Sequence, residues 1–304
     1  MNIARQIHAS EHPFFSLEFF PPKEEAQWPE FLETVHRLKA LDPLFASVTY
    51  GAGGSSQDRT LEITSRIHQM GLSTMAHLTC VGASPERISD FLRKLAAIGV
   101  DNVLALRGDP PKGQAAAQQS TDFHYAADLV RYVRRVQPHM GVAVAGYPAP
   151  HPESPSFTLD RAHTLAKVRA GADFVVTQLF FDVREYFDLV DGLRAEQVNV
   201  PVIPGILPVQ SLDSIRRVLG MCGANIPGKL YLALEEAHER GGAEAVREVG
   251  LCFAVQQIRQ LIEGGAPGIH LYTLNRAGLC LRLAEEVRGI MRPQASPASV
   301  PHEA

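Results

Sequence analysis

A single carboxylate within an apolar segment is the first feature of this sequence that points to chemistry. Glu18 lies in FSLEFFPP, residues 15–22, where Phe15, Leu17, Phe19 and Phe20 predict a buried strand. Burying an unpaired carboxylate costs several kcal/mol unless it takes up a proton or finds a partner. No partner is evident nearby, so we expect Glu18 to hold a proton and act as a general acid. The alternative is a structural glutamate that points outward or pairs with an arginine.

Polar side chains also stand near the ends of the other apolar segments. Each of these residues, considered alone, also has a purely structural explanation. Arg107 and Asp109 fit a salt-bridged turn, Gln178 fits a core amide bonded to backbone, and Lys167 fits a solvated charge. His151 alone is also more typical of a structural residue. The polar groups at the segment ends are Glu18, Thr49, Tyr50, His77, Thr79, Arg107, Asp109, Tyr147, His151, Gln178, Tyr272, Asn275 and Arg276.

Two common kinds of site find no support in the sequence. No H-x-H, H-E-x-x-H or clustered carboxylates occur, so nothing indicates metal catalysis. YGAGGSSQDRT, residues 50–60, is similar to a dinucleotide-binding loop, but Ser56 stands where G-x-G-x-x-G needs its last glycine. We interpret this segment as a flexible loop between a strand and a helix, whose backbone N–H groups could approach a ligand.

The elements that must position these residues alternate regularly along the chain. Short apolar segments, nearly continuous as in parallel strands covered on both faces, are followed by helical patterns. Ser84 and Pro85, for example, mark a helix start as its N-cap and first residue. The predicted strands lie at 15–22, 44–51, 73–80, 101–108, 140–148, 173–181, 200–208 and 267–274.

Eight strand–helix units predict an α/β protein with the (β/α)8 TIM-barrel fold, and a doubly wound sheet is the main rival. About forty further helical residues precede the last strand as an insertion. In such a barrel the carboxyl ends of the strands form one rim that carries the active site. The polar groups gather at those ends, so we expect one site on this rim, with Glu18 facing it.

Composition limits the other possibilities. The net charge of −4 gives no reason to expect nucleic acid or an anionic membrane as partner. We see neither a signal peptide nor an apolar run of about 18 residues, and the four cysteines are scattered, which fits the cytoplasm. We expect one catalytic domain over residues 1–292 and a disordered tail, rich in Pro, Ser and Ala, over residues 293–304.

Eight motifs in order resemble the methylenetetrahydrofolate reductase family. They are SLEFFPPK, SVTYGAGG, AHLTC, LALRGDPP, GYPAPHPE, GADFVVTQLFFD, PGILPV and YTLNRA, and they span residues 16–277. No single motif is decisive, but eight in sequence are highly specific. The length is similar to that of the bacterial catalytic barrel without a regulatory domain.

This resemblance implies a flavoprotein barrel, active in one-carbon metabolism and methionine biosynthesis. It implies FAD as cofactor and NADH or NADPH as co-substrate. FAD would carry a hydride to 5,10-methylenetetrahydrofolate and give 5-methyltetrahydrofolate in a ping-pong scheme. It also implies a homo-oligomer, with no nucleic-acid or membrane partner.

The resemblance also implies roles for individual residues. Glu18 is similar to the general acid of the family, and Asp109 to a carboxylate near the flavin and the pterin. Gln178 and Arg276 are similar to folate-contacting residues. The positions similar to FAD contacts are Thr49, Tyr50, Ala52, His77, Arg107, Gly108, Asp109, Ala126, Tyr147, His151, Asp160 and Lys167.

The sequence departs from the family pattern at four positions. Ser214 and Val218 stand where better-known bacterial members place a Gln and a Phe that contact folate and nicotinamide. His163 and Ala166 stand where the family usually has an Asn and an Arg near the flavin phosphates. These departures leave the FAD assignment in place but leave the electron donor open.

The chemistry explains why an acid is needed. The five-membered ring of the substrate opens when N10 is protonated, and a neutral carboxylic acid at an apolar strand end suits that proton transfer. Two alternatives from other classes stay open: a flavin-free barrel lyase that uses Glu18 as acid–base, and a barrel subunit of a larger redox complex that takes electrons from a protein donor.

Overall fold

The computed structural model describes residues 2–22, 24–50, 57–80, 82–108 and 122–291. Eight parallel strands close into a barrel in sequence order, because β1 pairs with both β2 and β8. The predicted barrel is confirmed, and closure rules out the doubly wound sheet. The strands are β1 (Phe14–Phe19), β2 (Phe45–Val48), β3 (Thr74–Thr79), β4 (Asn102–Leu106), β5 (Gly141–Gly146), β6 (Phe174–Leu179), β7 (Val202–Ile206) and β8 (Gly268–Tyr272).

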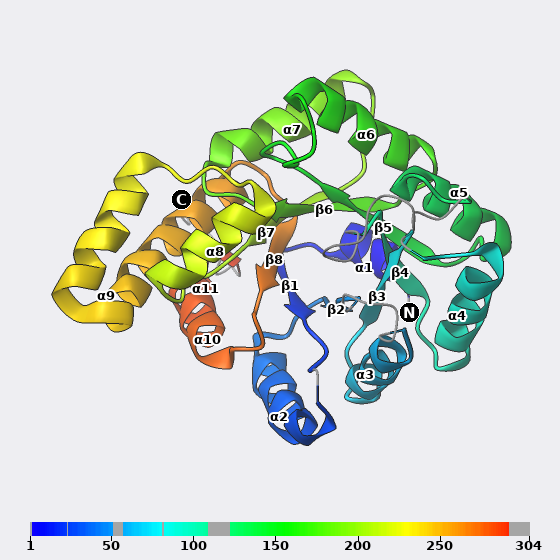
Figure 1. The fold of residues 1–304 in the computed structure, drawn as a ribbon, viewed down its shortest axis with the longest axis horizontal. Coiled ribbons are helices and arrows are strands. Elements are labelled where there is room, and N and C mark those ends of the chain that lie inside the picture. Colours follow the sequence, from blue (N-terminus) through cyan, green and yellow to red (C-terminus); the bar gives the residue numbers. More distant parts are fainter. Residues whose placement is uncertain (1, 23, 51–56, 81, 109–121, 292–304) are drawn as a thin grey trace, which may run out of the picture.

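Helices surround the strands (Figure 1). They are α1 (Ile3–Ala9), α2 (Trp28–Leu38), α3 (Gln57–Gln69), α4 (Pro85–Ala97), α5 (Ala126–Val136), α6 (Phe157–Arg169), α7 (Val183–Ala195), α8 (Leu212–Cys222), α9 (Gly228–Glu263), α10 (Ala277–Glu286) and α11 (Arg288–Met291), with short 3-10 turns at Glu25–Gln27 and Lys39–Leu41. The Ser84 cap forms as expected, since its side chain accepts a hydrogen bond from Arg87 N. No helix in the described ranges is both long and apolar enough to cross a bilayer.

The core has three parts. The largest fills the space between the barrel and its helices, and the second fills the barrel interior, where Phe45, Met75 and Phe174 pack together. Helix α1 contributes Ile3 and Ile7 to this interior cluster, and Ile3 N donates to Asn102 Oδ1 at the amino ends of the strands. Nothing in the sequence of the first residues predicts α1, because its apolar face is buried only once the barrel exists.

The predicted insertion before β8 is confirmed as the long α9, which extends together with α8 to one side of the barrel (Figure 1). Helix α9 is kinked at Gly241–Gly242, and Gly242 has φ 61 and ψ −150, a conformation open essentially to glycine alone. The third core cluster joins this insertion to residues at the carboxyl rim, among them Leu179, Leu207 and Tyr272. The insertion therefore supports the rim where the site is expected.

Candidate active site

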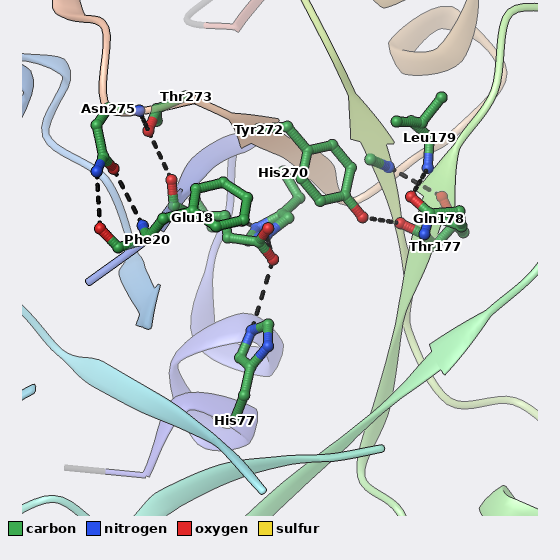
Figure 2. A network of polar contacts seen from close by, with 12 residues as sticks. Glu18, Phe20, His77, Thr177, Gln178, Leu179, His270, Tyr272, Thr273 and Asn275 are labelled. Atoms are coloured by element: carbon green, nitrogen blue, oxygen red, sulfur yellow. Dashed lines mark hydrogen bonds and ion pairs between the residues drawn. The ribbon is translucent and has the colours of Figure 1, made fainter. Parts of the chain in front are cut away.

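Glu18 lies near the carboxyl end of β1 and is buried, with 7% of its surface exposed. Its Oε2 lies 3.5 Å from His77 Nε2 of β3 and 3.7 Å from His270 Nε2 of β8 (Figure 2). The expectation that Glu18 has no partner nearby is wrong. The two imidazoles belong to strands far away in the sequence, which only barrel closure brings next to β1. The expectation that Glu18 is buried at the rim is confirmed. The expectation that Phe20 belongs to the buried strand is wrong, because β1 ends at Phe19 and Phe20 is 38% exposed.

His77 is neutral near pH 7. Burial lowers the pKa of His77 to about 4, the Glu18 carboxylate opposes that shift, and His270 adds to it. Its Nε2 has no hydrogen-bond partner in the described part of the chain. Because His77 is uncharged, its contact with Glu18 is not an ion pair.

His270 is a site residue that the sequence analysis missed. It is fully buried inside β8, its Nδ1 lies 2.8 Å from Ser16 Oγ, and its ring stacks on Phe45 at 5.9 Å between centroids. The signal was present, because His270 interrupts an apolar strand just as Glu18 does. What could not be read was the register that sets Ser16 beside His270.

Gln178 lies on β6, across the barrel from Glu18. Its Oε1 accepts a hydrogen bond from Leu179 N at 2.8 Å, so the carboxamide oxygen is satisfied by backbone, as the structural reading expected (Figure 2). The adjacent Thr177 carbonyl accepts a hydrogen bond from Tyr272 Oη at 2.7 Å. Gly205 of β7 leaves room for this contact, because a Cβ there would lie 2.6 Å from Tyr272 Cε2.

A second cluster lies over β5 and α6. Lys167 is only 8% exposed, its Nζ donates to the Ala145 carbonyl, and it lies 5.7 Å from the centroid of the Tyr147 ring. Burial lowers the pKa of Lys167 to about 8, and Asp160 opposes the shift. The reading of Lys167 as a solvated charge is therefore wrong. A buried cation of this kind fits an anionic ligand group.

The other residues of this cluster come together around His151. Asp160 Oδ2 accepts a hydrogen bond from His151 N at 2.6 Å, and the rings of Tyr147 and His151 meet edge to face at 5.1 Å. Arg107 Nη1 bonds Glu153 Oε2 at 2.6 Å, so β4 is tied to the segment after β5. Glu153 was not among the residues expected at the site. Arg107, Tyr147, His151, Asp160 and Lys167, predicted separately, thus lie around one part of the rim.

The remaining predicted positions are distributed around the same rim. Thr49 follows β2 and donates its N–H to the Phe19 carbonyl, and Tyr50 follows it. Gly108 has φ 80, which favours glycine, and Ala126 is the buried first residue of α5. Arg276 is exposed at the N-cap of α10. Ala52 and Asp109 lie outside the described residues, as does the tail over 293–304.

The four departures also have structural roles. Ser214 and Ser211 cap α8 reciprocally, and Val218 packs against the core of the insertion. His163 stacks on the exposed Tyr125 ring at 5.4 Å between centroids. Ala166 lines a hollow between α5 and α6, together with Arg131 and Arg169. Neither Ser214 nor Val218 offers the aromatic ring or the amide that the family pattern has there.

Comparison with known proteins bears on this arrangement. The sequence model described as methylenetetrahydrofolate reductase matches residues 3–288. Methylenetetrahydrofolate reductase (NADH) 1 of Arabidopsis thaliana is 40% identical over 273 residues, which cover 86% of this chain and 46% of that protein. The 5,10-methylenetetrahydrofolate reductase of Escherichia coli is 35% identical over 263 residues, with 86% of each chain covered.

The chain thus spans about half the length of the plant relatives it matches. Among solved structures, a Clostridium thermocellum protein described as binding two copies of 5-methyl-5,6,7,8-tetrahydrofolic acid matches with a TM-score of 0.68 at 17% identity. That match covers 94% of this chain and 99% of that one, and at this identity it shows the fold alone. The family match, by contrast, covers nearly the whole barrel and rests on sequence. This chain belongs to the methylenetetrahydrofolate reductase family.

Proposed function

We propose that this protein reduces 5,10-methylenetetrahydrofolate to 5-methyltetrahydrofolate with electrons from a reduced nicotinamide, using bound FAD in a ping-pong scheme. The observation that carries the proposal is Glu18. In a chain of this family, Glu18 is a buried carboxyl group at the barrel rim, beside a neutral imidazole. A carboxyl group in this place is within reach of a ligand bound at the rim and can pass a proton to it.

The residues around β5 and α6 fit FAD. A diphosphate needs a buried cation or N–H donors, and Lys167 supplies a buried ammonium group within this cluster. Arg107, Tyr147, His151 and Asp160 would hold other parts of the dinucleotide, and Gly108 lets the chain approach a ligand closely. The further positions proposed for FAD are Thr49, Tyr50, Ala52, His77, Asp109 and Ala126.

When bound, FAD supplies the hydride transfer between the nicotinamide and the one-carbon unit of the folate. The protein supplies the proton. Glu18 would donate it to N10 of the folate, which makes N10 a leaving group and opens the five-membered ring. Gln178, Arg276 and Asp109 would bind the folate, and the negative charge of Asp109 would stabilise the cation that ring opening produces.

The proposal also includes the electron donor and the oligomeric state of the protein. Some relatives carry NADH or NADPH in their names, the Arabidopsis thaliana protein the former and a Caenorhabditis elegans protein the latter. Ser214 and Val218 do not select between them. We expect one of these two nicotinamides to reduce the flavin, and we expect the protein to be a homo-oligomer.

Anaerobic stopped-flow absorbance tests the proposal. The purified protein should be yellow, NADH or NADPH should bleach the flavin band, and methylenetetrahydrofolate should restore it with formation of 5-methyltetrahydrofolate, identified by mass spectrometry. A colourless protein that ignores added FAD would contradict the cofactor and favour a flavin-free lyase. Flavin that neither nicotinamide reduces would favour a protein electron donor.

A further inference from the structure

The chain leaves β8 through an unusual turn. Leu274 and Asn275 are consecutive residues with φ 48 and φ 55, in the left-handed region. Asparagine adopts this conformation readily, but leucine rarely does. Such backbone conformations persist where the surrounding contacts hold them, and they cluster at functional sites. In this turn the side chain of Asn275 bonds the main chain that follows β1.

The side chain of Asn275 bonds both main-chain polar groups of Phe20, as a neighbouring strand would do within the sheet. Its Nδ2 donates to the Phe20 carbonyl at 2.7 Å, and its Oδ1 accepts from Phe20 N at 3.0 Å (Figure 2). The ladder between β1 and β8 ends at the pair Glu18 and Tyr272, so Phe20 lies beyond it. The carboxamide therefore continues the pairing past Glu18 on the side of β8.

Thr273, also just after β8, bonds the main chain of Glu18 itself. Its side chain is fully buried, its Oγ1 donates to the Glu18 carbonyl at 2.6 Å, and the same Oγ1 accepts from Asn275 N at 3.1 Å. One chain of hydrogen bonds thus runs from Asn275 through Thr273 to Glu18. It fixes the main chain at Glu18 and, through the carboxamide, at Phe20.

The carboxylate of Glu18 depends on this backbone support. Its distances to the His77 and His270 nitrogens, 3.5 and 3.7 Å, are longer than the ~2.7–3.2 Å of an N–H to oxygen hydrogen bond. Side-chain contacts with these two histidines therefore do not fix the carboxyl group. The main chain sets the position of the Cα and Cβ atoms from which the carboxyl group projects.

We propose that Asn275 is a positioning residue for Glu18. Its carboxamide, together with the Thr273 hydroxyl, holds residues 18–20 so that the Glu18 carboxyl group meets its proton acceptor at hydrogen-bond distance. This inference rests on the proposed function of Glu18 as the proton donor. Displacements of about 1 Å from the productive geometry can cost ~10²-fold in rate. Losing the carboxamide should therefore slow the one step that needs the proton.

Variants of Asn275 separate positioning from backbone strain. Asn275→Ala removes both hydrogen bonds to Phe20, while Asn275→Gly also removes them but adopts the left-handed conformation freely. Asn275→Asp keeps an acceptor for Phe20 N but loses the donor to its carbonyl. Asn199→Ala is the matched control, because Asn199 is exposed between α7 and β7, at the amino ends of the strands and away from the rim.

Stopped-flow measurement of both half-reactions, in FAD-loaded protein, reports the effect. We expect Asn275→Ala and Asn275→Gly to lower the limiting rate of flavin reoxidation by methylenetetrahydrofolate about 10–100-fold. The apparent Kd for the folate and the rate of flavin reduction by nicotinamide should change less than about threefold. Asn275→Asp should lie between these variants and the wild type, and Asn199→Ala should match the wild type.

Several results would overturn the proposal. Equal slowing of both half-reactions, a wild-type rate in Asn275→Gly, or a change in Tm without a change in the folate step would each show a merely structural role. If Asn275→Ala does not fold, Thr273→Val against Thr273→Ser tests the same contact, and only the hydroxyl-bearing variant should keep the rate. Wild-type protein that never reacts with methylenetetrahydrofolate would instead contradict the proposed function itself.

Discussion

Lys167 differs most from what its residue type suggests, because its ammonium group is buried between β5 and α6. In the protein without ligand, burial lowers the pKa of Lys167 to about 8. A phosphate group beside it would be stabilised by the protonated form and would favour that form in return. Lys167 and the nearby His151 therefore provide the most direct test of where FAD binds.

We predict that Lys167→Ala and His151→Ala weaken FAD binding more than they slow the chemistry of FAD-saturated protein. Loss of a charge-assisted phosphate contact should cost about 1.5–3 kcal/mol, or roughly 10–100-fold in Kd. FAD affinity of the wild type should fall as pH rises above about 8, because neutral Lys167 must first regain its proton. This pH dependence should vanish in Lys167→Ala.

Fluorescence titration of the protein with FAD from pH 7 to pH 9.5 measures both effects. Lys94→Ala is the control, because Lys94 lies on the exposed face of α4 beside Asp90. Unchanged affinity in both Lys167→Ala and His151→Ala would refute their assignment to the dinucleotide.

His77 gives a prediction for stability against pH. Its pKa is about 4 in the folded protein, against 6.5 as the reference value, so the unfolded chain takes up the proton first. The free energy of unfolding should therefore fall as pH drops from about 6.5 to 4, by up to about 3 kcal/mol in total. His77→Gln should remove this part of the acid sensitivity.

Denaturant unfolding at pH 7.5, 6.0 and 5.0 checks this expectation. The exposed His8 supplies the control variant His8→Gln, which should keep the wild-type pH dependence. A His77→Gln protein that loses as much stability between pH 7.5 and 5.0 as the wild type would place the acid sensitivity elsewhere.

How far single residues can be read from sequence depends on their neighbours. Glu18 could be found because it is the only charged residue in a strand that is apolar apart from Ser16, a pattern visible in eight letters. Its two histidine neighbours could not be assigned to it, because β3 and β8 reach β1 only through barrel closure. The burial of Lys167 was missed for a related reason: its helix buries polar as well as apolar residues, so no apolar face marks it.

At the scale of elements, the carboxyl end of β8 connects both sides of the site. Thr273 and Asn275 hold β1, whereas the Tyr272 hydroxyl bonds the Thr177 carbonyl of β6. The second contact crosses β7 at Gly205, where the chain carries no side chain to obstruct the Tyr272 ring. The eight strands were predictable from their apolar runs, but these links between their ends were not, because they depend on register and on one left-handed turn.

We predict that Gly205→Ala both destabilises the fold and disturbs the site. A Cβ at this position would meet the Thr177 carbonyl and the Tyr272 ring well below ordinary contact distance, and the carbonyl is backbone that cannot move freely. Overpacking of this kind costs about 1–3 kcal/mol. Thermal unfolding should show a lower Tm, by roughly 2–4 °C for each kcal/mol.

Gly220→Ala is the matched control for this change, because Gly220 lies within α8 with nothing close to the position of a Cβ. Alanine is the better helix former, so this variant should keep or slightly raise the Tm. A Gly205→Ala protein as stable as Gly220→Ala would contradict the packing described for Tyr272.

At the scale of the whole molecule, the strands, the surrounding helices and the insertion form one closed barrel over the described residues. Fold class was readable because strict alternation of apolar runs and helices leaves few topologies. The kink at Gly242 and the capping of the barrel interior by α1 could not be predicted from the sequence, since both depend on contacts made after the barrel closes.

The end of the folded domain at residue 292 is a prediction about the whole molecule. The Pro-, Ser- and Ala-rich composition of residues 293–304 predicts that they add nothing to the fold. A chain ending at residue 292 should therefore unfold in one cooperative transition, with a Tm within about 1 °C of the full chain. A shift of this size corresponds to a change of ~0.5 kcal/mol or less in the free energy of unfolding. A lower Tm, or a second transition, would show that the domain extends into this segment.

The central claim is that Glu18 donates the proton that opens the folate ring, and Glu18→Gln tests it most directly. Glutamine keeps the shape of the side chain but cannot supply a proton of useful acidity. Anaerobic stopped-flow should show flavin reduction by nicotinamide close to the wild-type rate, because that step needs no such proton. Reoxidation by methylenetetrahydrofolate should slow by about 10²–10⁴-fold. Equal slowing of both half-reactions, or an unaffected folate step, would contradict the role given to Glu18.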